Sequence, residues 1–138
     1  MLDGQELMTK EAARQSNPLV LAYIGDTVWD LFVRTSLVLE GRGNAGTLHR
    51  LSSKIVNARS QANVARRIFE TLSDDEKNIF MRGRNAKSAT VPKNMSIADY
   101  RYATALEAVV GYLYLTGQPQ KIEEIFKEAL NADQPTES

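Results

Sequence analysis

Hydrophobic residues recur every three or four positions along most of the chain, and no segment alternates in the manner of a strand. Two runs, residues 19–39 and 102–115, are apolar around nearly their whole circumference, which predicts buried helices. Asn17 and Pro18 can cap and start the first of these helices, and glycines at positions 41 and 43 can end it. The pattern therefore predicts an all-α protein with two buried central helices.

Amphipathic segments around the two apolar runs predict further helices. The sequence Ser73-Asp74-Asp75-Glu76 has the form of a capping box and marks the start of one of them. Polar residues and a proline between positions 85 and 94 predict a loop, and the polar tail at 133–138 is expected to fray. The expected helices span about residues 2–15, 18–40, 44–72, 74–84, 96–116 and 119–132.

A chain of 138 residues fits one domain, which is expected to span residues 1–138 with its core at about 17–132. The absence of cysteine excludes disulfides and thiolate metal sites, and a single histidine, His49, argues against histidine-based zinc chemistry. No basic start followed by an apolar stretch marks a secretory signal. Charged residues interrupt the first apolar run too often for a membrane span, so a cytoplasmic protein with no membrane partner is expected.

Each apolar run contains one carboxylate near its middle, Asp26 in the first run and Glu107 in the second. A buried carboxylate without a partner costs several kcal/mol or becomes protonated, so each of these two needs a compensating partner. One divalent cation with oxygen ligands could serve both carboxylates. Alternatively each carboxylate could pair with an arginine, which is the more frequent arrangement for a lone buried aspartate.

Small residues beside both carboxylates predict that the two apolar helices cross closely, so that short side chains from each helix can meet at one ion. Asp30 lies four residues after Asp26 and shares its helix face. A site of Asp26, Glu107 and Asp30, completed by waters, suits Mg²⁺, which can stabilise charge on a phosphoryl group. The small residues are Ala22, Gly25, Ala108 and Gly111.

Charge is unevenly distributed along the chain, although the formal net charge is zero. Residues 41–69 carry six basic side chains and no acidic one, and residues 81–101 carry five against Asp99 alone. If the two segments meet in space, they form a basic face that can bind a phosphate backbone. If they do not meet, they are two solvated surfaces that face different directions. The candidate nucleic-acid contacts are Arg50, Lys54, Arg59, Arg82, Arg84, Lys87 and Lys93.

The residues around both carboxylates resemble the ribonuclease III family. Leu21–Val28 (LAYIGDTV) is similar to the signature helix of that family, and Thr104–Gly111 (TALEAVVG) is similar to its second catalytic segment. Arg82–Ser88 (RGRNAKS), Pro92–Asn94 (PKN) and Tyr100–Thr104 (YRYAT) resemble the Mini-III ribonuclease branch specifically. The resemblance covers roughly residues 18–115 of the chain.

The resemblance implies an all-α endoribonuclease that forms a homodimer and cleaves both strands of duplex RNA with Mg²⁺. In the Mini-III branch the implied substrate is precursor large-subunit ribosomal RNA, which a ribosomal protein partner could present. By position, Asp26 and Glu107 would be the catalytic and metal-binding carboxylates. Apolar residues around Trp29 and at 112–115 exceed what a six-helix domain needs to bury, which also favours a symmetric dimer.

Two positions that are acidic in the family are not acidic in this chain. Ala22 stands where the resemblance implies a glutamate, and Thr104 stands where it implies an aspartate. Additional waters, or Asp30, would then complete the metal shell, and the Mini-III branch itself resembles this pattern. The alternative hypothesis is a non-catalytic helical module that binds RNA or regulates a partner, in which Asp26 and Glu107 are structural.

Overall fold

The chain folds into a set of packed helices, and the computed structural model describes residues 4–87 and 91–132. Part of the expected loop at 85–94 and the tail at 133–138 lie outside the described residues. Within the described part there is no strand, and no helix there is long and apolar enough to cross a membrane. The elements are α1 (Lys10–Gln15), α2 (Pro18–Leu39), α3 (Ala45–Ile55), α4 (Ala58–Ile68), the 3-10 turn η1 (Phe69–Thr71), α5 (Asp74–Asn85), α6 (Ile97–Leu115) and α7 (Pro119–Ala132).

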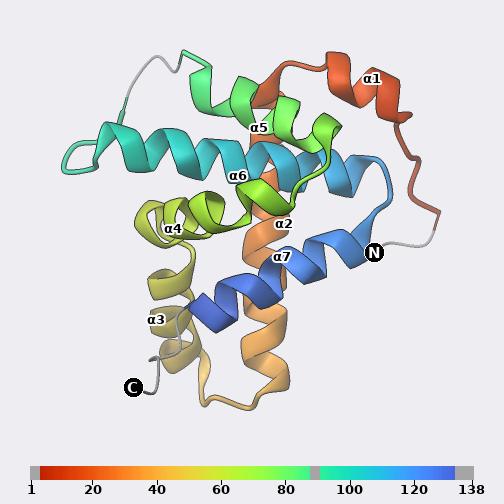
Figure 1. The fold of residues 1–138 in the computed structure, drawn as a ribbon. Helices are drawn as coiled ribbons and strands as arrows, with labels where there is room; N and C mark the ends of the chain where they lie inside the picture. Colours follow the sequence, from red (N-terminus) through yellow and green to blue (C-terminus); the bar gives the residue numbers. More distant parts are fainter. Residues whose placement is uncertain (1–3, 88–90, 133–138) are drawn as a thin grey trace.

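Helix α6 lies at the centre of the molecule and packs against α2, α4 and α5 (Figure 1). In that view α2, drawn in orange, passes behind α6, while α5 runs above α6 and α4 below it. The middle of α6 is buried on almost every side, from Ala103 to Leu106 and from Ala108 to Leu113. The two apolar runs of the sequence thus form a crossed pair around which the other helices are assembled.

Side-chain caps start the main helices where the sequence predicts. The Asn17 side chain accepts a hydrogen bond from the Leu19 amide at 2.8 Å, and Pro18 occupies the first helical position of α2. The expected capping box opens α5, and Ser96 caps α6. Gly41 follows α2 with a φ of 65°, a left-handed conformation that favours glycine. Local sequence therefore sets the starts of both central helices.

The expected single helix from residue 44 to 72 is wrong, because the structure has two helices, α3 and α4, with a break between them. The side chain of Asn57 produces this break. Its amide group donates to the carbonyl of Lys54 at 2.7 Å, and its oxygen accepts from the amide of Ser60 at 2.9 Å. Such local hydrogen bonds compete with continuation of a helix. The first helix is also shorter than expected, because it begins at Lys10 rather than near residue 2.

The surplus apolar surface lies on α2, where Leu31 near Trp29 is exposed, and not at residues 112–115. Trp29 and Tyr112 belong to the core, with exposed fractions of 1 % and 2 %, and the Trp29 ring packs edge-on against Phe126 of α7. Helix α2 is therefore covered on only part of its circumference, so the expectation of burial on all sides is wrong. The exposed large apolar residues of α2 are Val20, Tyr23, Leu31, Val38 and Leu39.

Candidate active site

Helices α2 and α6 approach each other backbone to backbone at two glycines. A Cβ atom added to Gly25 would lie 1.8 Å from the carbonyl oxygen of Glu107, and one added to Gly111 would lie 1.9 Å from that of Leu21. Any side chain at either position would force the helices apart, because the interior has no room for it. The close crossing that the small residues predicted is therefore confirmed.

The crossing brings Asp26 of α2 and Glu107 of α6 into direct contact through a side-chain hydrogen bond. Glu107 is half-buried, whereas Asp26 is exposed. The expectation of two buried carboxylates is therefore wrong for Asp26, since the face of α2 that carries it is not covered by another described helix. The pair sits at the edge of the core, where a substrate can reach it.

Burial raises the pKa of Glu107, and the hydrogen bond and negative charge of Asp26 raise it further, to about 9. At neutral pH Glu107 therefore retains its proton when no cation is bound. A divalent cation could replace that proton, because its charge would stabilise both groups in their ionised form. The alternative partner, an arginine, is not found for either group among the ion pairs of the described residues.

Asp30 lies one helical turn after Asp26, but its carboxylate is already engaged. Arg34 donates from Nε to both oxygens of Asp30, at 3.1 and 3.0 Å. The described residues contain no group of three or more acidic, histidine or cysteine side chains placed to hold a metal ion. The protein part of a metal shell would thus consist of Asp26 and Glu107, and a contribution from Asp30 would require its ion pair with Arg34 to open.

Ala22 and Thr104 leave the two remaining acidic positions of the motif without a carboxylate. Both residues are buried, with exposed fractions of 8 % and 7 %. The hydroxyl of Thr104 donates to the carbonyl of Tyr100 within α6 at 2.9 Å, as threonine commonly does inside a helix. The remaining coordination positions of an ion at Asp26 and Glu107 would therefore be filled by water and substrate.

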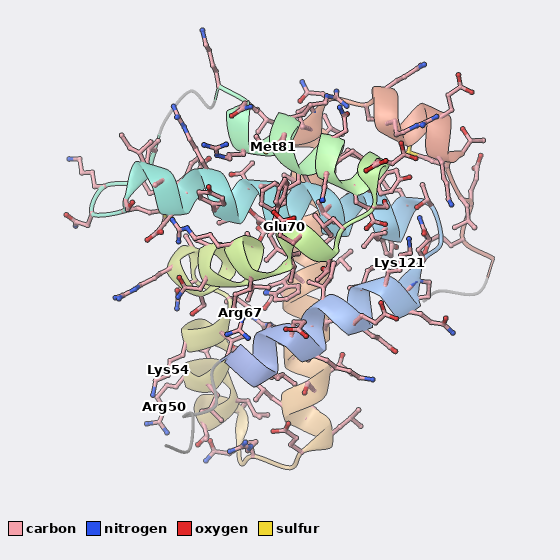
Figure 2. The ribbon with its side chains drawn as sticks, in the orientation of Figure 1. Arg50, Lys54, Arg67, Glu70, Met81 and Lys121 are labelled. Atoms are coloured by element: carbon pink, nitrogen blue, oxygen red, sulfur yellow. The ribbon has the colours of Figure 1, made fainter. Side chains whose placement is uncertain are left out.

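Three of the basic residues at positions 41–69 are free of carboxylate partners within the described part of the chain. Arg50 and Lys54 extend from α3 into solvent (Figure 2), and Arg59 is exposed near the start of α4. These three are the ones that the sequence analysis selected as nucleic-acid contacts. The other three form ion pairs, Arg42 with Glu40, Arg66 with Asp99 and Arg67 with Glu128.

Arg82 has a structural partner that the sequence did not reveal. It lies in the last turn of α5, and its guanidinium donates to the backbone carbonyls of Arg14 and Ser16. These hydrogen bonds tie α5 to the end of α1 and engage both terminal nitrogens of the guanidinium. Arg82 thus has a structural contact that the sequence analysis did not include, and its expected phosphate contact stays a prediction. Lys87 and Lys93 are exposed in the segment that follows α5.

Arg84 and Arg66 converge on Tyr102, a cluster that the sequence analysis missed. The guanidinium carbons lie 5.3 and 4.5 Å from the centre of the Tyr102 ring, respectively. The two basic segments of the sequence therefore do meet in space, at α6. No sequence signal could have shown this, because the three residues come from three helices that meet only through tertiary packing.

Comparison with known proteins gives one consistent result. Residues 19–118 match the ribonuclease III domain family. Among proteins named Mini-ribonuclease 3, that of Thermoanaerobacter sp. (strain X514) is 44 % identical over 91 % of this chain and 89 % of its own length. That of Brevibacillus brevis is 46 % identical over 83 % of this chain and 85 % of its own length. A crystal structure of a Fusobacterium nucleatum protein matches with a TM-score of 0.79 at 31 % identity, covering 88 % of this chain and 97 % of that one.

Proposed function

Because the chain belongs to the ribonuclease III family, we propose that Asp26 and Glu107 jointly hold the divalent cation with which it cleaves duplex RNA. Family membership makes the chain an endoribonuclease with the all-α nuclease fold, as its two carboxylate motifs predicted. The observation that carries the proposal is the direct contact between the two carboxyl groups where α2 crosses α6. No other pair of acidic side chains in the described residues combines such contact with a raised pKa.

We propose Mg²⁺ as the cation, because carboxylate oxygens are the hard ligands that a small hard cation prefers. The raised pKa of Glu107 supports this fit, since burial and the neighbouring carboxylate of Asp26 both disfavour its ionised form, which a bound cation would stabilise. When bound, the cation would stabilise charge that develops on the phosphoryl group and would activate water for attack. The chain itself holds Glu107 against Asp26, and the two glycines of the crossing fix the separation of their helices.

The unpaired basic residues would hold the RNA backbone across this site. Contacts from lysine and arginine to phosphates position a duplex without reading its sequence. This suits A-form RNA, which is recognised mainly through its shape and 2′-hydroxyl groups. The residues proposed for this role are Arg50, Lys54, Arg59, Arg84, Lys87 and Lys93.

The substrate that we propose is precursor large-subunit ribosomal RNA, cut in the stem formed by its paired ends, in the cytoplasm. The resemblance to the Mini-III branch supports this substrate. We also propose a homodimer, which would direct one site to each strand of the duplex. The exposed apolar side chains of Val20 and Tyr23, on the same helix as Asp26, support a second copy docking beside the site.

A second candidate function is RNA binding without cleavage. It is favoured by Ala22 and Thr104, which leave the site with two carboxylates and no third acidic group placed to share a metal ion among the described residues. In that case the basic surface would still bind duplex RNA, but the RNA would remain intact. The two functions therefore differ in a single measurable outcome.

End-labelled duplex RNA incubated with the protein distinguishes the two functions. We expect cleavage in both strands with Mg²⁺, binding without cleavage when Ca²⁺ replaces it, and no cleavage of single-stranded RNA of the same sequence. Intact RNA with Mg²⁺, under conditions where the protein binds the duplex, would instead establish the non-catalytic function.

A further inference from the structure

Side chains from three helices meet at Tyr102 of α6. The guanidinium carbon of Arg66 on α4 lies 4.5 Å from the centre of the Tyr102 ring, and that of Arg84 on α5 lies 5.3 Å from it. Both distances fall within the range in which a cation is attracted to the face of an aromatic ring. The ring is therefore a shared platform for two arginines.

The platform is fixed by the hydrophobic core. The ring of Phe80, a buried residue of α5, contacts Tyr102 edge-on with 6.2 Å between the ring centres. A ring held in this way restricts the guanidinium groups that stack on it, so they lose less conformational freedom when a ligand binds. The two arginines are thus preorganised, unlike arginines that extend freely into solvent.

The two arginines differ in their charge partners. Arg66 donates to Asp99 at 3.0 Å, whereas Arg84 forms no ion pair with a carboxylate in the described part of the chain. Two like charges over one ring repel each other, and a single carboxylate offsets only one of them. The remaining positive charge sits on a planar guanidinium, which binds a phosphate through two parallel hydrogen bonds.

We propose that Tyr102 is a positioning residue that holds Arg84, with Arg66 beside it, to bind a phosphate of the RNA backbone. This inference rests on the proposed function, because it assumes that duplex RNA is the substrate. Lys87 and Lys93, which follow Arg84 in the chain, are exposed and continue the positive surface as an extended polyanion requires. An acidic polypeptide is the competing ligand, and the test below separates the two.

The position of Tyr102 on α6 determines which kinetic constant it affects. Tyr102 lies five residues before Glu107, which places the two side chains about 140° apart around the helix axis. Tyr102 therefore faces α4 and α5, whereas Glu107 contacts Asp26 of α2. The arginines bind RNA away from the bond that is cut, so they contribute to affinity and not to the chemical step.

The first test compares Tyr102→Leu with Tyr102→Phe. The leucine variant keeps apolar bulk against Phe80 but loses the ring, so duplex binding should weaken about five- to thirtyfold through loss of two cation–π contacts. KM should rise while kcat stays within about threefold, and the salt dependence of binding should keep its slope because no charge is lost. Tyr102→Phe retains the ring and should restore binding. A merely structural defect would instead lower the active fraction, and hence kcat, at unchanged KM.

Arginine variants keep the test decisive if Tyr102→Leu does not fold. Arg84→Lys keeps the charge but loses the planar group, so it should weaken binding at unchanged salt slope. Arg84→Gln should weaken binding further and reduce the slope by about one unit. Arg67→Gln is the matched control, because Arg67 neighbours Arg66 on α4 but pairs with Glu128 of α7. The control should bind duplex RNA within about twofold of the parent.

The outcomes separate this inference from the proposed function. Binding to duplex RNA is measured in Ca²⁺, so that it does not depend on cleavage. If the parent binds and cleaves duplex RNA while Arg84→Lys and Tyr102→Leu bind like the parent, the inference is overturned and the function stands. If the parent binds no duplex RNA, both are overturned. Weakened binding of the variants to polyglutamate, with RNA binding unchanged, would assign the arginines to a protein partner and also overturn the inference.

Discussion

At Gly25, the absence of a side chain determines how close the two carboxylates of the site can come. Gly25→Ala would place a methyl group 1.8 Å from the carbonyl oxygen of Glu107, so α2 and α6 would have to separate. We expect the free energy of unfolding to fall by about 3 kcal/mol or more, since overpacking here meets backbone and not a flexible side chain. We expect the cleavage rate to fall as well, because Asp26 moves with its helix. Thermal unfolding measures the first effect and a cleavage assay the second.

Gly46→Ala on α3 is a matched control for this change. The nearest atom to a Cβ added there is the Asn44 side-chain oxygen at 3.5 Å, an ordinary contact. Alanine favours a helix over glycine by about 1 kcal/mol, so the control should be as stable as the parent or slightly more stable. A Gly25→Ala protein that unfolds at the parent temperature would contradict the backbone contact between α2 and α6.

The sequence predicted that Asp26 and Glu107 lie together, but it did not predict that Asp26 is exposed. Asp26 and Glu107 were found because each interrupts an apolar helix and stands in a recognisable motif. The environment of Asp26 was misjudged because an apolar helix face indicates burial only when another element covers it. Val20 and Tyr23 made α2 look buried on every side, yet both side chains are exposed. Coverage is a property of tertiary packing, which hydrophobic periodicity does not report.

At the scale of elements, local capping signals predicted the starts of α2, α5 and α6, whereas the break between α3 and α4 was missed. The apolar residues on both sides of the break keep helical spacing, so the pattern alone favoured one helix. The competing hydrogen bonds of Asn57 run to Lys54 and to Ser60, one on each side of the break. An asparagine can also lie within a continuous helix, so only the structure shows that the helix is interrupted at Asn57.

The ion pair between Glu76 and Lys121 joins the start of α5 to α7 at 2.8 Å and makes stability depend on pH. Burial raises the pKa of Glu76, but hydrogen bonds from Lys121 and Ser73 outweigh burial and leave the pKa below its usual 4.5. A carboxyl group whose pKa is lowered by folding stabilises the fold at pH values above its pKa in the unfolded chain. This stabilisation is lost as the pH falls through the lower pKa that the group has in the folded protein. The contribution of Glu76 should therefore be complete at neutral pH and disappear in acid.

Glu76→Gln should accordingly lower the free energy of unfolding by about 1 to 2 kcal/mol at neutral pH. The decrease should be much smaller when the pH is far below 4.5. Urea unfolding of parent and variant across a pH series measures this difference. Glu70→Gln is the control, because Glu70 is exposed and lies 3.8 Å from Lys77, so it should change stability little at any pH. If the loss of stability caused by Glu76→Gln stays constant from neutral to acidic pH, the ion pair is not the source of that loss.

At the scale of the whole molecule, the apolar surface of α2 should be the dimer interface. Val20 and Tyr23 are 59 % and 82 % exposed, and they lie within two turns of Asp26. Cleavage of both strands needs two sites, which a two-fold axis beside α2 would supply. We expect sedimentation equilibrium at micromolar concentration to show a dimer for the parent and a monomer for Tyr23→Ser. Leu39→Ser, at the far end of α2, removes an equally exposed side chain and should leave the dimer intact.

Two results would count against that assembly. A parent protein that sediments as a monomer both alone and with duplex RNA would contradict the homodimer. If Leu39→Ser dissociates the dimer and Tyr23→Ser does not, the interface lies at the other end of α2, away from Asp26 and Glu107.

The arrangement of charge is also a property of the whole fold. Sequence showed two basic segments but could not show whether they meet, because their relation depends on how α4 and α5 pack on α6. The structure joins them at Tyr102, and it pairs Arg42 with Glu40 and Arg67 with Glu128, which offsets part of the positive charge. It also shows the hydrogen bonds of Arg82 to the backbone of Arg14 and Ser16, which no sequence pattern indicates.

The central claim is that Asp26 and Glu107 act as one unit that holds a cation for cleavage, and a double-mutant cycle tests it most directly. The measurement is the single-turnover cleavage rate of bound duplex RNA in Mg²⁺ for the parent, Asp26→Asn, Glu107→Gln and the double variant. We expect each single change to slow cleavage by about a thousandfold or more while RNA binding in Ca²⁺ persists. The double variant should be little slower than either single variant, because ligands of one ion do not contribute independently. A rate for Asp26→Asn within threefold of the parent, or fully additive losses in the double variant, would contradict the claim.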